Sequence, residues 1–267
     1  MQIKSILLTG DDGYNSIGTR LLAHFLHPKY DVKIAATKQQ QSGMGGKINI
    51  KGGTYGEALI ENVPALWVDG SPADAVEAAV NHYRQEFDLI ISGINLGANV
   101  AGSIISSGTF SAVFRALNLG LSQRGIALSW NIPPAQWFMD HSPTEPLDAY
   151  LAYPGQTALD LLHLILKEKF WNASLLNINF PENPTHEVVF TRPLQNINNF
   201  FLPVELDNQT MTFRYPGGVI EPEHSDMTID VHALQAGKIT ITPCRADFLD
   251  PQVYDQTKQS THQLPHT

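Results

Sequence analysis

Residues 6–18 constrain the fold of this chain more than any other stretch. They begin with an unbroken apolar run, typical of a buried parallel strand, and continue into two adjacent carboxylates, Asp11 and Asp12. At the carboxyl end of a strand in an open α/β sheet, side chains face the crevice where ligands bind. Neighbouring carboxylates repel each other unless both stay hydrated or a cation neutralises them. The stretch therefore predicts a metal site, although Asp-Asp-Gly is also ordinary turn chemistry.

Two further predicted strands run into polar side chains. A strand over residues 30–36 leads into a glycine-rich loop that holds Ser42, and a strand starting near residue 87 leads into Asn95 and Asn99. Asn can offer a neutral oxygen to a hard cation and N–H donors to an anion. Because Asn also favours turns for conformational reasons, the pattern alone leaves both interpretations open.

A hydroxyl-rich segment contains Ser107, Gly108 and Thr109 and precedes a helix expected over residues 110–119. Hydroxyls and free N–H groups at a helix start can hold a phosphate. The same residues serve equally well as ordinary N-caps.

The remaining patterns indicate a strand and helix alternation that fades after about residue 185. We expect a helix over 17–26, a helix over 72–83 capped by Ser71, and a proline-rich loop over 131–153. Further strands are expected over residues 48–50, 55–66, 66–68, 126–129 and 175–181, with a helix over 157–170. This order predicts an α/β fold with a mostly parallel, Rossmann-like sheet flanked by helices.

Bulk properties narrow the class of protein. A chain of 267 residues suits one large α/β domain, and its net charge of −9 argues against a broad basic surface for duplex nucleic acid. The single cysteine, Cys244, excludes an internal disulfide and fits a reducing compartment. No apolar stretch approaches a membrane span, so we expect no membrane partner and a cytoplasmic location.

Three regions are expected along the chain. Residues 1–185 form the catalytic core, and residues 186–245 form a β-hairpin arm and a returning core strand. Residues 246–267 form a C-terminal tail. Short strand-like pieces at 187–191, 211–215 and 238–242, with a turn at 216–218, suggest that the arm serves subunit contact.

Several segments occur in the order found in one known family. They are residues 6–13, 41–43, 68–74, 92–99, 107–109, 176–181 and 239–243. On these segments, which span roughly residues 1 to 245, the chain resembles the SurE (survival protein) nucleotidases. Ordered matches over that length are far more specific than any single glycine motif.

The resemblance implies a Rossmann-like phosphatase that uses one Mg or Mn ion per subunit to release phosphate from nucleoside 5′- and 3′-monophosphates. It also implies a homodimer or homotetramer in which the arm and the C-terminal segment contact another subunit. By the same resemblance, Asp11 and Asp12 are the catalytic residues. The metal ligands implied are Asp11, Asp12, Ser42 and Asn95, and the phosphate-binding residues implied are Asn99, Ser107, Gly108 and Thr109.

The chain departs from the family pattern at three places. Gly10 stands where the family usually has Asn, and Arg115 stands where it has Glu. Residues 37–40 lack the usual Pro and Arg. These changes put substrate preference in question and motivate an alternative, a nucleotide-binding protein whose phosphatase activity is weak or lost.

Two unrelated classes of enzyme fit the sequence less well. A dinucleotide-dependent dehydrogenase needs Gly-x-Gly-x-x-Gly after the first strand, and the spacing of Gly10 and Gly13 does not match. The ten histidines include no His-x-x-x-His pair for a zinc site. Trp130 and Trp137 flank the proline-rich loop, where they either pack the loop or stack a base.

Overall fold

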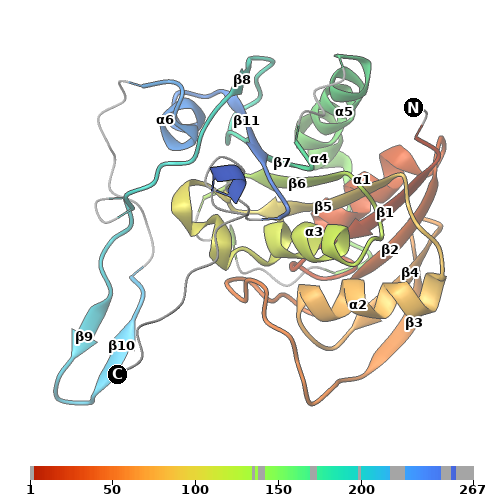
Figure 1. The fold of residues 1–267 in the computed structure, drawn as a ribbon, viewed down its shortest axis with the longest axis horizontal. Helices are drawn as coiled ribbons and strands as arrows, with labels where there is room; N and C mark the ends of the chain where they lie inside the picture. Colours follow the sequence, from red (N-terminus) through yellow and green to blue (C-terminus); the bar gives the residue numbers. More distant parts are fainter. Residues whose placement is uncertain are drawn as a thin grey trace.

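The structure, a computed structural model, describes residues 3–133, 136–137, 142–168, 173–197, 200–216, 226–247 and 254–256. Within these residues nine strands form one sheet in the order β3-β4-β2-β1-β5-β6-β7-β11-β8. Helices α1 and α5 pack on one face of this sheet, and α2 and α3 pack together on the other (Figure 1). The predicted α/β architecture is confirmed.

The middle of the sheet is parallel. Its strands are β4 (Val63–Val68), β2 (Asp31–Thr37), β1 (Ser5–Thr9), β5 (Leu89–Leu96), β6 (Gly125–Trp130) and β7 (Leu175–Phe180). Most of their residues are buried, because helices cover both faces of the sheet. Since these strands run the same way, their carboxyl ends lie along one edge of the molecule.

Four main helices flank the sheet, and α1, α2 and α3 begin at side-chain caps. They are α1 (Ile17–Leu26), α2 (Pro72–Tyr83), α3 (Gly108–Asn118) and α5 (Thr157–Glu168). The predicted start of α2 is confirmed, since Ser71 and Asp74 form a capping box. Helix α3 starts two residues earlier than expected, because Ser107 is its N-cap and accepts a hydrogen bond from the Phe110 N–H.

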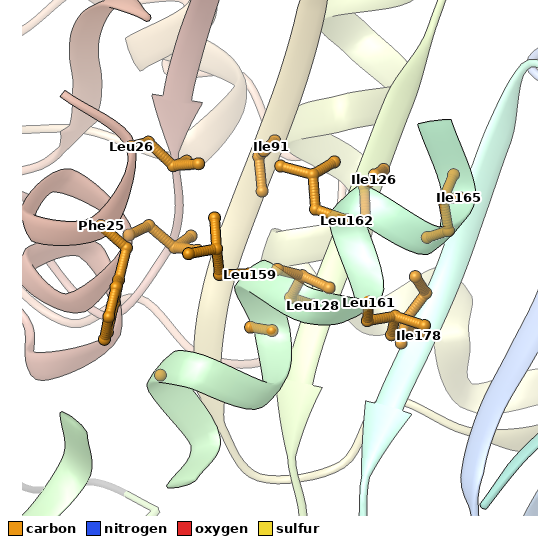
Figure 2. A pocket seen from close by; sticks show the side chains of 13 residues that line it. Phe25, Leu26, Ile91, Ile126, Leu128, Leu159, Leu161, Leu162, Ile165 and Ile178 are labelled. Atoms are coloured by element: carbon orange, nitrogen blue, oxygen red, sulfur yellow. The ribbon is translucent and has the colours of Figure 1, made fainter. Parts of the chain in front are cut away.

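The face beneath α1 and α5 is an apolar core. Figure 2 shows side chains from α1, β5, β6, α5 and β7 closing around a cavity of about 10 Å³. Ile91 and Leu162, at 1% and 5% exposure, are representative of its lining. A cavity of this size holds about one water molecule at most, so this region is packing and not a ligand site.

Two sequence predictions between β2 and α2 are wrong. Residues 48–50 do not form a strand; their backbone is tied to the start of α2, where Asn49 N–H donates to Asp74. The apolar run 55–66 does not form one strand either. It is the first part of an antiparallel hairpin of β3 (Tyr55–Ile60) and β4, with Glu61 and Asn62 at positive φ in the turn.

The region after β7 mixes core and arm. Strands β8 (Val188–Phe190) and β11 (Ile239–Cys244) join the main sheet, and β9 (Glu205–Asp207) pairs with β10 (Thr212–Arg214) in a hairpin that projects from the body (Figure 1). Predicted strands in this region are thus confirmed at β8, β10 and β11.

Several short elements were not predicted. They are helix α6 (Asp230–Gln235), the 3₁₀ helix η1 (Ala101–Ser106), the single turn α4 (Asp148–Tyr150) and the adjoining π-type turn η3 (Leu151–Gln156). The last two lie in and after the predicted proline-rich loop.

Three predictions fall partly or wholly outside the described residues. They concern the end of the 157–170 helix, the turn at 216–218 and most of the tail from residue 252. Among the helices that are described, none combines the length and apolar character needed to cross a bilayer.

Candidate active site

The strand order reverses direction between β1 and β5, and we call the region at the carboxyl ends of these two strands the crevice. Strand β1 lies between β2 and β5, so the chain leaves β1 toward one side of the sheet and later fills the other. Such a reversal point is where open α/β sheets bind ligands, outside the carboxyl ends of the strands. Asp11 and Asp12 follow β1 at this point, and Asn95 is the penultimate residue of β5.

Asp11 sits under the first turn of α3. Its side chain is 3% exposed, and its Oδ1 accepts a 2.5 Å hydrogen bond from the Thr109 hydroxyl. A Cβ on Gly108 would lie 2.6–2.9 Å from the Asp11 side chain, so only glycine lets the helix start approach this closely. Burial raises the pKa of Asp11 to about 6, although hydrogen bonds from Thr109 and from nearby backbone N–H groups lower it.

Asp12 and Asn95 each hold one buried oxygen without a hydrogen-bond partner in the described residues. Asp12 Oδ2 accepts a 2.8 Å hydrogen bond from the Leu96 N–H, and Asn95 Nδ2 donates to the Gly97 carbonyl at 2.7 Å. Asp12 Oδ1 and Asn95 Oδ1 are buried without a hydrogen-bond partner in the described part of the chain. Burial, and next the charge of Asp11, hold the pKa of Asp12 well above its usual range.

A bulge in β5 brings Asn95 to this position. The pairing of β5 with β6 shifts register between Ser92 and Asn95. Gly93 lies in the bulge at φ +112°, and a Cβ there would come within 2.2 Å of the Leu128 carbonyl oxygen. Bulges of this kind redirect a side chain beside a functional site.

The loop that holds Ser42 lies against Asp11. The Gln41 N–H donates to the Asp11 carbonyl at 2.6 Å, and the Gln40 side chain donates to Ser42 Oγ at 2.7 Å. Gln40 also donates to the Trp137 carbonyl at 3.0 Å, so it links this loop to the proline-rich loop. The structure therefore brings the loop that holds Ser42 against the backbone of Asp11, at the strand end where the sequence placed it.

The residues expected to bind phosphate lie at the same edge. Ser107 caps α3, Gly108 opens it, and Thr109 bonds to Asp11. Asn99 lies in the loop between β5 and η1, and its Nδ2 donates to Ser129 Oγ at 2.9 Å. The positive end of the dipole of the eleven-residue helix α3 is therefore at the crevice.

The donor set at the crevice is made of oxygen atoms. In the residues that the structure describes, no cluster of three or more His, Cys, Asp or Glu side chains is found that could hold an ion. Two carboxylates, an amide and a hydroxyl are nevertheless present here, and hard divalent cations prefer such oxygen ligands. This set of groups fits a divalent cation. Such an ion would neutralise the negative charge of the paired acids and would give the two unpartnered oxygens a binding partner.

Two of the departures from the family pattern, Gly10 and Arg115, have defined surroundings. A Cβ at Gly10 would meet only backbone atoms of Gly93, at 3.6 Å or more, so a side chain can be accommodated there. Arg115 pairs with Glu77 of α2 in a contact between helices, with both side chains partly exposed. The positive charge of Arg115 is thus paired with a carboxylate of α2.

The two tryptophans beside the proline-rich loop differ. Trp130 packs edge-on against Tyr150 and Tyr153, as expected for a loop-packing role. Trp137 is half-buried, with its indole N–H donating to the Ile132 carbonyl at 2.8 Å. Its ring lies against Gly97, where a Cβ would come within 3.3 Å.

Some residues around the site were not singled out by sequence reasoning. Gln40 orients Ser42, and Asn177 and Asn179 both contact Asn99. The sequence signal for the last two was their alternation in the otherwise apolar strand β7.

Comparison with known proteins supports one family. The family model described as "Survival protein SurE" matches residues 6–199. The 5′-nucleotidase SurE of Solidesulfovibrio magneticus is 32% identical over 251 residues, covering 92% of each chain. That of Methanoculleus marisnigri is 30% identical, covering 95% of each chain. The crystal structure of the SurE protein from Aquifex aeolicus, at 23% identity, has the same fold, with a TM-score of 0.73 over 95% of this chain and 98% of the other.

Proposed function

This chain belongs to the SurE family, and we propose that it is a metal-dependent phosphatase that hydrolyses nucleoside 5′-monophosphates to nucleoside and phosphate. Its relatives are named 5′-nucleotidase. A 5′-nucleotidase is a phosphoric monoester hydrolase, and we assign this chain to the same class of enzyme. The observation that carries the metal dependence is the pair of buried neighbouring acids, Asp11 and Asp12, beside unpartnered oxygens of Asp12 and Asn95.

Four residues are proposed to hold one Mg or Mn ion per subunit. They are Asp11, Asp12, Ser42 and Asn95, all of which offer oxygen atoms. When bound, such an ion supplies positive charge that polarises a phosphoryl oxygen and lowers the pKa of water. Within this set, Asn95 Nδ2 is fixed by the Gly97 carbonyl, so its Oδ1 is presented in one direction.

The phosphate is proposed to lie at the start of α3. There the Ser107 hydroxyl can donate to an anion, and the positive end of the α3 dipole favours negative charge. The N–H groups of the first turn already donate to Asp11 and Ser107, so they position the turn. Gly108 and Thr109 set the position of this turn, because Thr109 is bonded to Asp11 and Gly108 packs on it. Asn99 Nδ2 carries two hydrogens, of which Ser129 accepts one.

Asp11 and Asp12 are proposed as the catalytic residues. Asp11 Oδ1 is occupied by the Thr109 hydroxyl, which fixes its orientation. Asp12 keeps Oδ1 without a partner in the described residues. Of the two, Asp12 is therefore the better placed to accept a proton from an attacking water molecule, provided that its Oδ1 is not fully occupied by the ion.

The alternative is a nucleotide-binding protein with weak or lost phosphatase activity. Gly10, which lacks the amide that the family usually places beside the acids, is the observation that favours it. Arg115 gives it little support, because this side chain pairs with Glu77 of α2.

We also propose that the protein assembles as a homodimer or homotetramer. Leu206, Met211, Phe213 and Tyr215 of the β9–β10 arm are 66–86% exposed, and clustered exposed apolar side chains mark interaction surfaces. On this proposal the core is residues 1–185, and the arm and returning strand are residues 186–245. The tail, residues 246–267, contacts another subunit. The proposed location of the protein is the cytoplasm. Light scattering after gel filtration would find a single subunit mass if this is wrong.

Turnover with a panel of nucleoside 5′- and 3′-monophosphates tests the main proposal. We expect phosphate release with Mg or Mn, none after chelation, and loss of activity in Asp12→Asn. Asp88→Asn is the matched control, because Asp88 also accepts backbone hydrogen bonds but lies at the opposite edge of the sheet. Metal-independent turnover would exclude the mechanism. Nucleotide binding without product would favour the alternative.

A further inference from the structure

Strand β7 carries two amide side chains in its interior. Asn177 and Asn179 are both 0% exposed and point to the same face of the sheet, since they are two residues apart. Both make hydrogen bonds with one residue about 80 positions earlier, Asn99.

The contacts grip the backbone of Asn99. Asn179 Oδ1 accepts from the Asn99 N–H at 2.8 Å, and Asn179 Nδ2 donates to the Asn99 carbonyl at 3.0 Å. Asn177 Nδ2 donates to the same carbonyl at 2.8 Å. The side-chain amide of Asn179 thus bonds to both the N–H and the carbonyl of Asn99, as the backbone of a neighbouring strand would. Because the Asn99 N–H needs an acceptor, Oδ1 of Asn179 faces it and Nδ2 faces the carbonyl.

Asn99 has few other constraints. The chain leaves β5 at Leu96 and enters η1 only at Ala101, so Asn99 lies between two elements. Its side chain is held at one point, by Ser129 on β6. The two amides on β7 therefore set the position of its backbone relative to the sheet.

We infer that Asn177 and Asn179 are positioning residues, which hold Asn99 so that its amide meets the phosphate at the start of α3. This inference rests on the proposed function, in which Asn99 is a phosphate ligand. The inference separates the proposed phosphate ligand Asn99 from the proposed metal ligands. In the described residues, neither amide of β7 makes a hydrogen bond to Asp11, Asp12, Ser42 or Asn95.

The neighbouring strand offers a matched control. Thr240 of β11 lies directly opposite Asn179, on the same face, and is also 0% exposed. Its hydroxyl makes no hydrogen bond in the described residues. Thr240→Val therefore changes a buried polar group at the same depth and leaves the contacts of Asn99 intact.

The experiment measures phosphate and Mn²⁺ binding separately. For Asn179→Leu we expect the inhibition constant for inorganic phosphate in Mn²⁺, and the KM for a nucleoside monophosphate, to rise about tenfold. The dissociation constant for Mn²⁺ should stay within about twofold. Thr240→Val should leave all three values within about twofold.

A second variant guards against loss of the fold. Asn177→Leu removes one hydrogen bond and also a buried oxygen, Oδ1, that has no partner in the described residues. We expect it to fold and to weaken phosphate binding about threefold. Thermal unfolding of each variant shows whether the measured sample is native.

A double-mutant cycle decides whether the amides act through Asn99. Asn99→Ala combined with Asn179→Leu should bind phosphate no worse than Asn99→Ala alone. Additive losses, equal losses of Mn²⁺ and phosphate affinity, or normal phosphate binding by Asn99→Ala would overturn the inference.

Failure of the proposed function gives a different result. If the unaltered protein binds phosphate in Mn²⁺ but turns over no ester, the proposed function fails and the binding cycle still decides the inference. If the unaltered protein binds no phosphate in Mn²⁺, the inference is wrong as well.

Discussion

Two buried regions of the sheet differ in what they bury. One lies beneath α1 and α5, and the other lies at the carboxyl ends of β1 and β5. The first is lined by apolar side chains around a very small cavity. The second buries two neighbouring acids, and oxygens of Thr9, Ser92, Asp12 and Asn95 have no partner there in the described residues. Buried polar groups without partners cost stability. The comparison indicates that the apolar region stabilises the fold, whereas the buried acids and unpartnered oxygens of the crevice destabilise it. The proposed binding of an ion there would offset this cost.

The largest expected effect is on the crevice. Asp12→Asn should lower kcat/KM by about 10³-fold or more, because it removes the carboxylate that we propose as a metal ligand and a catalytic group. In metal-free protein the same change should raise the melting temperature by roughly 2–4 °C, since it removes repulsion with Asp11 and keeps an acceptor for the Leu96 N–H. Turnover and unfolding in chelator measure the two effects. A lower melting temperature would contradict this account of the crevice.

The matching change in the apolar region should have the reverse profile. Leu162→Ala removes a buried side chain from the wall of the small cavity seen in Figure 2, and such truncations destabilise by about 2–5 kcal/mol. Because Leu162 belongs to the apolar core beneath α1 and α5, and not to the proposed site, kcat/KM of the folded protein should change little. Denaturant unfolding and turnover of the native fraction check this. A large loss of kcat/KM would show that the two regions are not separate.

Helix caps provide a smaller and more local test. Ser107→Ala and Ser71→Ala each remove an N-cap, and each should destabilise by about 1 kcal/mol. Only Ser107 lies at the crevice, so only its substitution should also lower kcat/KM, by about threefold to tenfold. Equal kinetic effects of the two variants would argue against phosphate binding at the start of α3.

The smallest effect is expected at Gly10. Gly10→Asn restores the amide that the family usually carries, and the nearest atoms to a Cβ there are 3.6 Å or more away. We expect the variant to fold normally and to change kcat/KM by no more than about threefold. A large gain in activity would indicate that Gly10 is the reason for weak catalysis, as the nucleotide-binding alternative requires.

Sequence patterns predicted the parts of the fold that depend on local chemistry. The strand that ends at Asp11 and the capping box at Ser71 are examples, because the apolar run and the cap are written in consecutive residues. The wrong strand at 48–50 has the opposite cause. There the backbone is held by Asp74, 25 positions away from Asn49, and no local pattern shows that contact.

The candidate site was predictable to the same extent. Asp11 follows β1, Asn95 lies near the end of β5 and Thr109 lies in the first turn of α3, which places all three at one edge. Their mutual contacts depend on sheet order, which brings β1 beside β5. The grip of Asn177 and Asn179 on Asn99 crosses about 80 residues, so it could only be found in three dimensions.

The most direct test of the central claim is a crystal structure of the protein grown with Mn²⁺, read by anomalous scattering. The account predicts one peak per chain at the carboxyl ends of β1 and β5, in coordination contact with oxygens of Asp11, Asp12, Ser42 and Asn95. An empty crevice in which both acids bond only to protein N–H and hydroxyl groups would contradict it.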